Sequence, residues 1–215
     1  MTIQHHPSDV TLAAFAAGTL DQGQRMAIAT HVDGCARCRA FVGAMEHVGG
    51  DVLDRLPATA MTVGSLARVM RRIDEPVPRP IRVAQPSDLD DIPGLPDVVR
   101  RCRAGEWKWI APGVHLRPII LPHPGPTRVF LLKAAPGTHM LQHSHTDLEM
   151  TCVLTGAFSH DGGRFGPGDF DLGDEEVDHR PLVEEGEDCI CLVAMRGELR
   201  LSGLMGHLMQ PFVRL

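Results

Sequence analysis

The feature that most constrains the fold of this chain is a proline-rich stretch at residues 75–97, EPVPRPIRVAQPSDLDDIPGLPD. It holds six prolines and almost no periodic apolar pattern, and proline interrupts both helices and central strands. Such a composition is typical of a linker. We therefore divide the chain into residues 1–75, a linker at 76–97 and a second unit at 98–215. We expect the two units to behave independently, because such a linker should make few contacts with either core.

The first unit carries the signals of four short helices. Ser8 can cap the first helix, and Asp21 with Gln24 forms a capping box for the second. So few helices bury little apolar surface, and a unit of this kind usually needs a metal or a partner to hold together. The apolar residues at helical spacing are Leu12, Phe15 and Ala16, then Met26, Ala29 and Val32, then Phe41, Val42 and Met45 in a helix starting near Cys35, and finally Val63, Leu66, Met70 and Ile73 in a helix from Thr62 to Ile73.

The second unit is predicted to be all-β. Short runs rich in Val, Ile, Phe and Trp alternate with turn residues at the spacing typical of a sandwich or barrel, and Asp161-Gly162-Gly163 indicates a hairpin turn. No helix-length periodic segment interrupts them. The predicted strands run from Trp107 to Ile110, Val114 to Leu121, Val129 to Ala134, Glu149 to Phe158, Gly163 to Leu172 and Cys189 to Met195.

Composition excludes several classes of function. The 215 residues carry a formal charge of −6, with 21 Lys and Arg against 27 Asp and Glu, so the chain lacks the basic surface of a direct nucleic-acid binder. No apolar run reaches the length of a membrane span, and the first ten residues lack the features of a secretory leader. We expect a cytoplasmic protein, in which six cysteines serve as metal ligands or buried small residues rather than as disulfides.

The first candidate metal site is His6, His31, Cys35 and Cys38, spaced as H-x24-H-x3-C-x2-C. Two imidazoles and two thiolates suit tetrahedral zinc, and four protein ligands would make that zinc structural. A helix N-terminus at the cysteines would lower their thiol pKa and favour thiolates. His5 competes with His6 as the first ligand, because spacing does not separate adjacent residues. The alternative interpretation of the two cysteines is a redox pair or two buried small residues.

This motif within a short helical unit resembles the zinc-binding anti-sigma factor domain, and the resemblance covers residues 1–75. It implies that the unit binds a sigma factor of the extracytoplasmic-function (ECF) type, in about equal amounts, and blocks its use by RNA polymerase. The apolar stripe of the fourth helix suits helix-in-groove recognition of such a partner. The alternative is that the stripe packs on its own helical bundle.

A second candidate metal site lies at residues 137–156, GTHMLQHSHTDLEMTCVLTG, which reads G-x5-H-x-H-x3-E-x6-G. Strand alternation places His143 and His145 on one face, and a short turn returns Glu149 to the same interior. His179, at the end of the segment G-x5-D-x-E-x2-H, is the candidate fourth ligand. This set of nitrogen and oxygen donors suits zinc, iron, manganese or nickel.

These two segments resemble the paired motifs of the cupins, small jelly-roll barrels that hold a metal inside. The second segment departs from the family pattern at Asp174, Glu176 and Val183, which affects the local turn more than the ligand. Cys189 and Cys191 lie two apart in a predicted strand and so should both face the barrel interior, as buried small residues or as a redox pair. His115, His123, His139, His160 and His207 lack a partner pattern and are interpreted as surface or packing residues.

A zinc anti-sigma domain joined to a metal-binding cupin is similar to one subclass, the ChrR-type anti-sigma factors. The resemblance implies that residues 1–75 hold a sigma factor and that the cupin governs its release under stress, with oxidative stress the usual theme. One alternative is a metal-dependent cupin enzyme, a dioxygenase or isomerase, with an accessory zinc domain. Another is a metal-homeostasis sensor. No catalytic residue is predicted, and co-purification of a sigma factor would separate the three.

Overall fold

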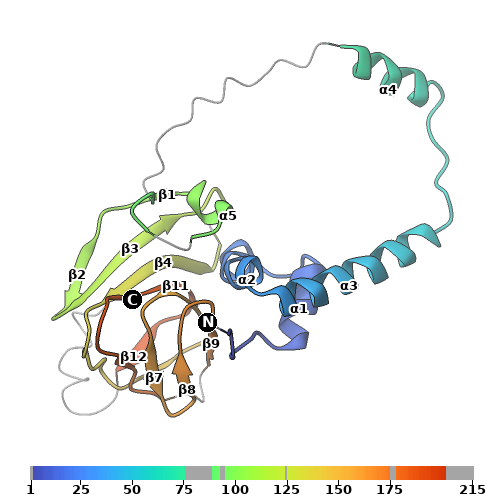
Figure 1. Ribbon diagram of the computed structural model, residues 1–215. Helices are drawn as coiled ribbons and strands as arrows, with labels where there is room; N and C mark the ends of the chain where they lie inside the picture. The colour runs from blue at the N-terminus through green and yellow to red at the C-terminus, as the bar shows by residue number, and fades with distance from the viewer. Residues whose placement is uncertain (1, 76–88, 93–94, 124, 175–177, 202–215) are drawn as a thin grey trace.

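Short helices precede a set of β-sheets in the computed structural model, which describes residues 2–75, 89–92, 95–123, 125–174 and 178–201 (Figure 1). The four predicted helices are confirmed, and one helical turn opens the second half of the chain. The helices are α1 (Asp9–Ala16), α2 (Gln22–Gly34), α3 (Ala36–Asp54), α4 (Ser65–Asp74) and α5 (Asp97–Arg100).

Local side chains start the first two helices as their sequence signals predict. The hydroxyl oxygen of Ser8 accepts a hydrogen bond from the backbone N–H of Thr11 at 3.2 Å. At α2, the Asp21 carboxylate accepts from the Gln24 N–H at 3.0 Å, and the Gln24 side chain accepts from the Asp21 N–H at 3.2 Å. These bonds satisfy amide groups that have no partner inside the helix. Cys35 ends α2 and caps α3, so the chain reverses between them within one residue.

The strands form three sheets. The largest has the order β1-β3-β4-β11-β6-β9, with β2 paired to β3, and the smaller ones are β10-β7-β8 and β12-β5. Every pairing between the named strands is antiparallel. The strands are β1 (Arg103–Ala104), β2 (Lys108–Ala111), β3 (Val114–Ile120), β4 (Thr127–Ala134), β5 (His143–His145), β6 (Glu149–Thr155), β7 (Phe158–His160), β8 (Gly163–Phe165), β9 (Phe170–Gly173), β10 (Leu182–Val183), β11 (Cys189–Arg196) and β12 (Leu199–Leu201).

Two predicted strands are each divided by a turn. The run from Glu149 to Phe158 breaks into β6 and β7 because Gly156 has a φ of 66°, a conformation that only glycine adopts readily. The run from Gly163 to Leu172 breaks into β8 and β9 around residues 166–169. The hairpin turn between β7 and β8 falls where it was predicted.

Strand β11 explains how the two halves of the chain are joined. Its side chains alternate between faces, and nearly all of them are buried, so the large sheet needs apolar cover on both sides. Leu192 and Ala194 belong to a core shared with the helices, and Cys191 and Val193 belong to a second core between the sheets. A strand without a solvent face therefore requires a layer outside the barrel.

Helix α2 supplies that layer by packing against β11, β6 and β4 (Figure 1). Ile28 of α2 is fully buried in the shared core, as is Leu89 from the stretch predicted to be a linker. The expectation that this stretch would make few contacts is therefore wrong for its end, where Ile92 and Leu95 are also buried. Burial of these apolar side chains against the sheet outweighs the flexibility that the prolines suggested.

The far half of α3 and all of α4 extend away from this body (Figure 1). No residue of α4 is buried. No described helix is both long and apolar enough to cross a membrane.

Candidate metal centres

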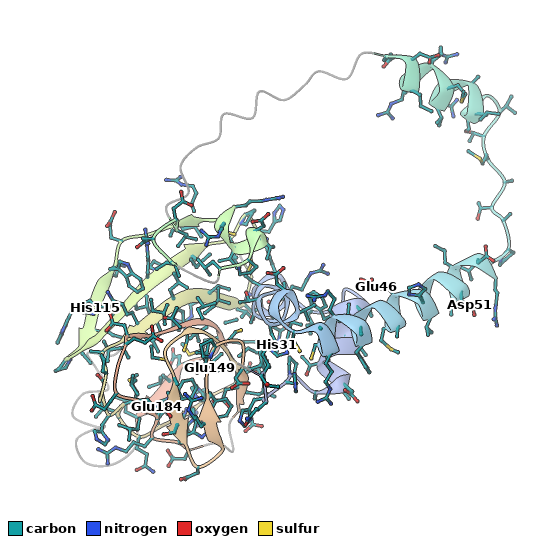
Figure 2. The ribbon with its side chains drawn as sticks, viewed as in Figure 1. His31, Glu46, Asp51, His115, Glu149 and Glu184 are labelled. Atoms are coloured by element: carbon teal, nitrogen blue, oxygen red, sulfur yellow. The ribbon has the colours of Figure 1, made fainter. Side chains whose placement is uncertain are left out.

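The first cluster joins three segments at the edge where the helices meet the large sheet. His6 precedes α1, His31 lies in the last turn of α2, and Cys35 and Cys38 begin α3. His31 and both cysteines are buried, and Figure 2 places His31 between the helices and the barrel. The four predicted residues are thus brought together, and the short reversal at Cys35 is what allows one helix end to face another helix start.

The donor atoms of this cluster are close to one another. Nδ1 of His6 lies 3.4 Å from Nε2 of His31 and 3.4 Å from the sulfur of each cysteine, and Nε2 of His31 lies 3.2 Å from the Cys38 sulfur. Tetrahedral zinc, with bonds of about 2.1 Å to nitrogen and about 2.3 Å to sulfur, would separate such donors by roughly 3.4–3.8 Å. The residues therefore fit a zinc ion with little adjustment.

His5 does not join this cluster. Its ring lies against Phe165, with ring centroids 4.2 Å apart. Of the two adjacent histidines that the sequence left open, the structure brings His6 to the cysteines.

Burial sets the protonation of the donors in the absence of a metal. Loss of water lowers the pKa of His31, although its hydrogen bond to the Gly168 carbonyl opposes this, and burial followed by the charge of Arg37 lowers the pKa of His6. Both imidazoles are then neutral ligands at pH 7. Contrary to the lowering expected at a helix N-terminus, burial and a hydrogen bond with Cys35 raise the pKa of Cys38 to about 12, so a metal must displace the thiol proton.

The second cluster lies inside the barrel. His143 and His145 come from β5. His179 lies after β9 in the chain and pairs with His143 through an isolated antiparallel bridge. Nε2 of His179 is 3.0 Å from Nε2 of His143 and 3.5 Å from Nε2 of His145. All three rings are buried. The alternation predicted for this strand therefore directs two imidazole nitrogens to one point, and the bridge to His179 supplies the third.

The environment of these histidines favours neutral rings with free lone pairs. Nδ1–H of His143 donates to the Leu141 carbonyl at 2.7 Å, which leaves Nε2 as an acceptor toward the cluster. Burial lowers the pKa of His143 and His145, and burial together with His143 lowers the pKa of His179 to about 4. Nδ1 of His145 and of His179 are buried and have no hydrogen-bond partner among the residues that the structure describes. Such a group of desolvated nitrogens fits a divalent transition metal.

Glu149 stands beside the three histidines without joining their closest group. Its carboxylate Oε2 lies 3.7 Å from Nδ1 of His145. The side chain lines a cavity in the barrel, and Figure 2 labels Glu149 among the strands of the barrel. Burial raises its pKa, and the nearby His143 opposes that change. The predicted return of Glu149 to the same interior is thus seen.

A cavity of about 440 Å³ opens next to this cluster. His143, His179 and Glu149 form its polar end, and the remaining wall is mostly apolar. Cys189 and Cys191 line the same cavity with their sulfurs 3.7 Å apart, so the prediction that both face the barrel interior is confirmed. The apolar wall includes Val114, Phe130, Leu132, Met140, Phe158, Val193 and Met195.

One pair near this cluster was missed. His160 was interpreted as a surface or packing residue, yet its Nε2–H donates to the Asp171 carboxylate at 3.0 Å while its Nδ1 accepts from the Gly162 N–H. Its ring lies 5.0 Å from that of His179. His160 comes from β7 of the sheet β10-β7-β8, and Asp171 comes from β9 at the edge of the large sheet. Their approach depends on how the two sheets face each other, and no spacing in the sequence indicates it. His207 lies outside the described residues.

Comparison with known proteins agrees with this architecture. Residues 96–198 match the family described as the ChrR cupin-like domain, and residues 11–39 match a zinc-finger family. The chain is 40% identical to the anti-sigma-E factor ChrR of Cereibacter sphaeroides over all 215 residues, which covers 100% of both chains.

A solved structure gives the same result. The crystal structure of Rhodobacter sphaeroides SigE in complex with the anti-sigma ChrR contains a chain that matches with a TM-score of 0.74 and 36% identity, covering 90% of this chain and 99% of that one. Sequence similarity to ChrR covers the whole chain, and it includes both the helices and the cupin barrel. The chain belongs to the ChrR family of anti-sigma factors.

Proposed function

We propose that this chain is an anti-sigma factor that binds an ECF-type sigma factor, in a 1:1 complex, and so keeps it from RNA polymerase. The relative that is 40% identical is the anti-sigma-E factor ChrR, and the related crystal structure contains SigE in complex with ChrR. The chain is thus a regulator and not an enzyme, and the cupin enzyme alternative loses its support. A regulator of RNA polymerase acts in the cytoplasm, and the proposal places the chain there.

The observation that carries this proposal is the exposed face of α4. Leu66, Val69, Met70 and Ile73 recur at the spacing of one helix face and are 72%, 50%, 52% and 67% exposed. An apolar face of this kind is costly to leave in water and suits a groove on a protein partner. The alternative interpretation, a stripe packed on its own bundle, does not describe α4, which has no buried residue.

The test compares substitutions on the apolar face of α4 with a substitution on its opposite face. Leu66→Gln with Met70→Gln should abolish co-purification of the sigma factor, because both replacements keep a good helix former and remove the apolar surface. Arg71→Gln, on the opposite face, is the matched control and should retain the partner. Equal partner recovery from all the variants would contradict the assignment of this face.

The proposal also assigns roles to the two clusters. His6, His31, Cys35 and Cys38 would hold one structural zinc, because four protein ligands leave no open position. His143, His145, Glu149 and His179 would hold a zinc or another divalent transition metal beside the cavity. We assign partner binding to residues 1–75 and signal reception to the cupin at 98–215, with residues 76–97 between them.

Release of the sigma factor would follow a stress signal, with oxidation the favoured kind, received at the cupin metal. A signal releases a partner only by favouring a state that binds it less well, and the cavity gives a small molecule or oxidant access to Glu149 and the histidines. A sigma-dependent reporter under oxidative challenge tests this. A strain with Glu149→Gln should keep full repression and lose induction, and normal induction would remove the cupin site from the signalling path.

A further inference from the structure

We propose that the turn between β8 and β9, residues 166–169, positions the zinc ligands of the helical half, with Asp169 as the positioning residue. The proposal rests on the zinc role assigned above to His6, His31, Cys35 and Cys38. It adds that this site is not a property of the helices alone. Part of its support comes from the cupin.

The first contact is at His31. Its Nδ1–H donates to the carbonyl oxygen of Gly168 at 2.8 Å, and the side chain is fully buried. A carbonyl accepts only, so this bond keeps the proton on Nδ1 and leaves Nε2 as the lone pair directed at Cys38. Such an outer partner fixes the tautomer and the ring orientation of a metal-binding histidine. Here that partner lies 137 residues away in the cupin.

The second contact is at the segment that carries His6. The Asp169 carboxylate oxygen Oδ1 accepts from the backbone N–H groups of Gln4 at 2.6 Å and His5 at 2.9 Å. The N–H of Phe170 donates to the carbonyl of His5 at 3.1 Å. These bonds set the direction of the backbone immediately before His6. Without them, a chain end of this kind is poorly ordered.

The burial and the hydrogen bonds of Asp169 keep its carboxylate fixed and charged in this position. It is only 5% exposed, and its second oxygen accepts from the Gly166 N–H at 2.9 Å, which closes the turn. Burial opposes the charge, but the backbone donors His5, Gly166 and Gln4 outweigh it and lower the pKa of the carboxyl. A charged carboxylate with several amide donors makes hydrogen bonds that are stronger than neutral ones.

Gly168 completes the contact. Its φ of 89° is a conformation that other residues rarely adopt, and a Cβ there would lie 2.7 Å from the side chain of Ile3. The N-terminal segment and the turn are therefore in close contact along residues 3–5. The same turn presents one carbonyl and one carboxylate to the two histidines of the zinc site, one by direct bond and one through the backbone.

The test uses the full-length protein loaded with zinc. Asp169→Ala should raise the rate of zinc loss to a chromophoric chelator by about tenfold, since loss of an outer-shell partner typically lowers metal affinity by about 10- to 100-fold. Hydrogen exchange at residues 3–6 should speed up in the same variant. Asp161→Asn, an exposed carboxyl in the neighbouring hairpin, is the matched control and should match the wild type.

A second variant approaches the contact from the other side, in case Asp169→Ala disturbs the barrel. Gln4→Pro removes one N–H donor to Asp169 and leaves the cupin sequence unchanged, and Thr2→Pro is its control. Faster zinc loss in Gln4→Pro, with the wild-type melting temperature of the cupin, supports the proposal. Wild-type rates of zinc loss in both Asp169→Ala and Gln4→Pro would overturn it. If the wild-type protein held no zinc at the Cys and His cluster, the proposed function would fail instead.

Discussion

The two clusters of potential metal ligands differ in how they are enclosed. The Cys and His cluster takes four donors from three segments of the helical half and is sealed where those helices meet the barrel. The three-histidine cluster lies on one side of a cavity of about 440 Å³, with Glu149 set apart from the closest group. A closed set of donors suits a structural ion, and an open set allows a further ligand.

Under the proposed function, this difference in enclosure corresponds to two roles, partner binding by the helical half and signal reception by the cupin. Loss of the ion from the Cys and His cluster should loosen the helices around it, because α1 and α3 bury little apolar surface and only α2 packs closely on the sheet. Loss of an ion from the three-histidine cluster should leave the barrel folded, because the barrel has an apolar core of its own. Under the proposed function, the ion of the Cys and His cluster would hold the helices in shape, and the ion of the three-histidine cluster would be the one that responds to a ligand.

The largest effect is expected at the closed cluster. Cys38→Ser should lose about one zinc per chain and most of the sigma factor binding, because it removes a ligand from a four-donor site. Metal analysis by mass spectrometry and co-purification measure both. Cys102→Ser, at a half-buried cysteine outside the clusters, should behave as wild type. Full sigma factor binding by a zinc-free Cys38→Ser protein would contradict the structural role of the closed cluster.

Packing of α2 on the sheet should be the next largest contribution. A Cβ at Gly23 would lie 2.7 Å from the backbone oxygen of Thr127, but one at Gly34 in the same helix meets nothing within 4 Å. Gly23→Ala should therefore lower the free energy of unfolding by about 1–3 kcal/mol, and Gly34→Ala should not. Thermal or denaturant unfolding compares the two variants. Equal stabilities would mean that the helices do not depend on this contact.

The pH dependence of metal binding should also distinguish the clusters. Burial and Cys35 hold the pKa of Cys38 at about 12, so zinc binding releases its proton, and this proton alone should raise the apparent zinc affinity at least about tenfold per unit between pH 7 and 9. The histidines of the barrel have pKa values lowered by burial, His179 to about 4, and are already neutral there. Their metal affinity should change little over this range. Competition titrations with a chelator at several pH values would measure both slopes.

The smallest structural effect is expected at the open cluster. His143→Ala should empty the cupin metal site but change affinity for the sigma factor by less than about twofold, because the barrel keeps its core and α4 is untouched. Metal content and binding by calorimetry test this, with His115→Ala outside the cluster as control. A large loss of partner affinity would show that the open cluster also determines the shape of the helical half.

Much of the molecule could be predicted from the order of its residues. Capping residues such as Ser8 and Asp21 marked the helix starts, and the alternation His143, Ser144, His145 placed two ligands on one face. Those signals are local, since a cap or a strand face depends on a few neighbouring residues. The same locality made the spacing of His31, Cys35 and Cys38 informative.

The tertiary structure decided what depends on distant contacts. It brought His6 rather than His5 to the cysteines. It paired His160 with Asp171. It also placed Leu89 and Ile92 in a core despite the prolines around them. It also joined His31 to Gly168, a contact that no motif in either half indicates. A sequence pattern reports what a segment can form by itself. Which surfaces then meet depends on the apolar area that each leaves uncovered, and that is settled only when α2 closes over the sheet.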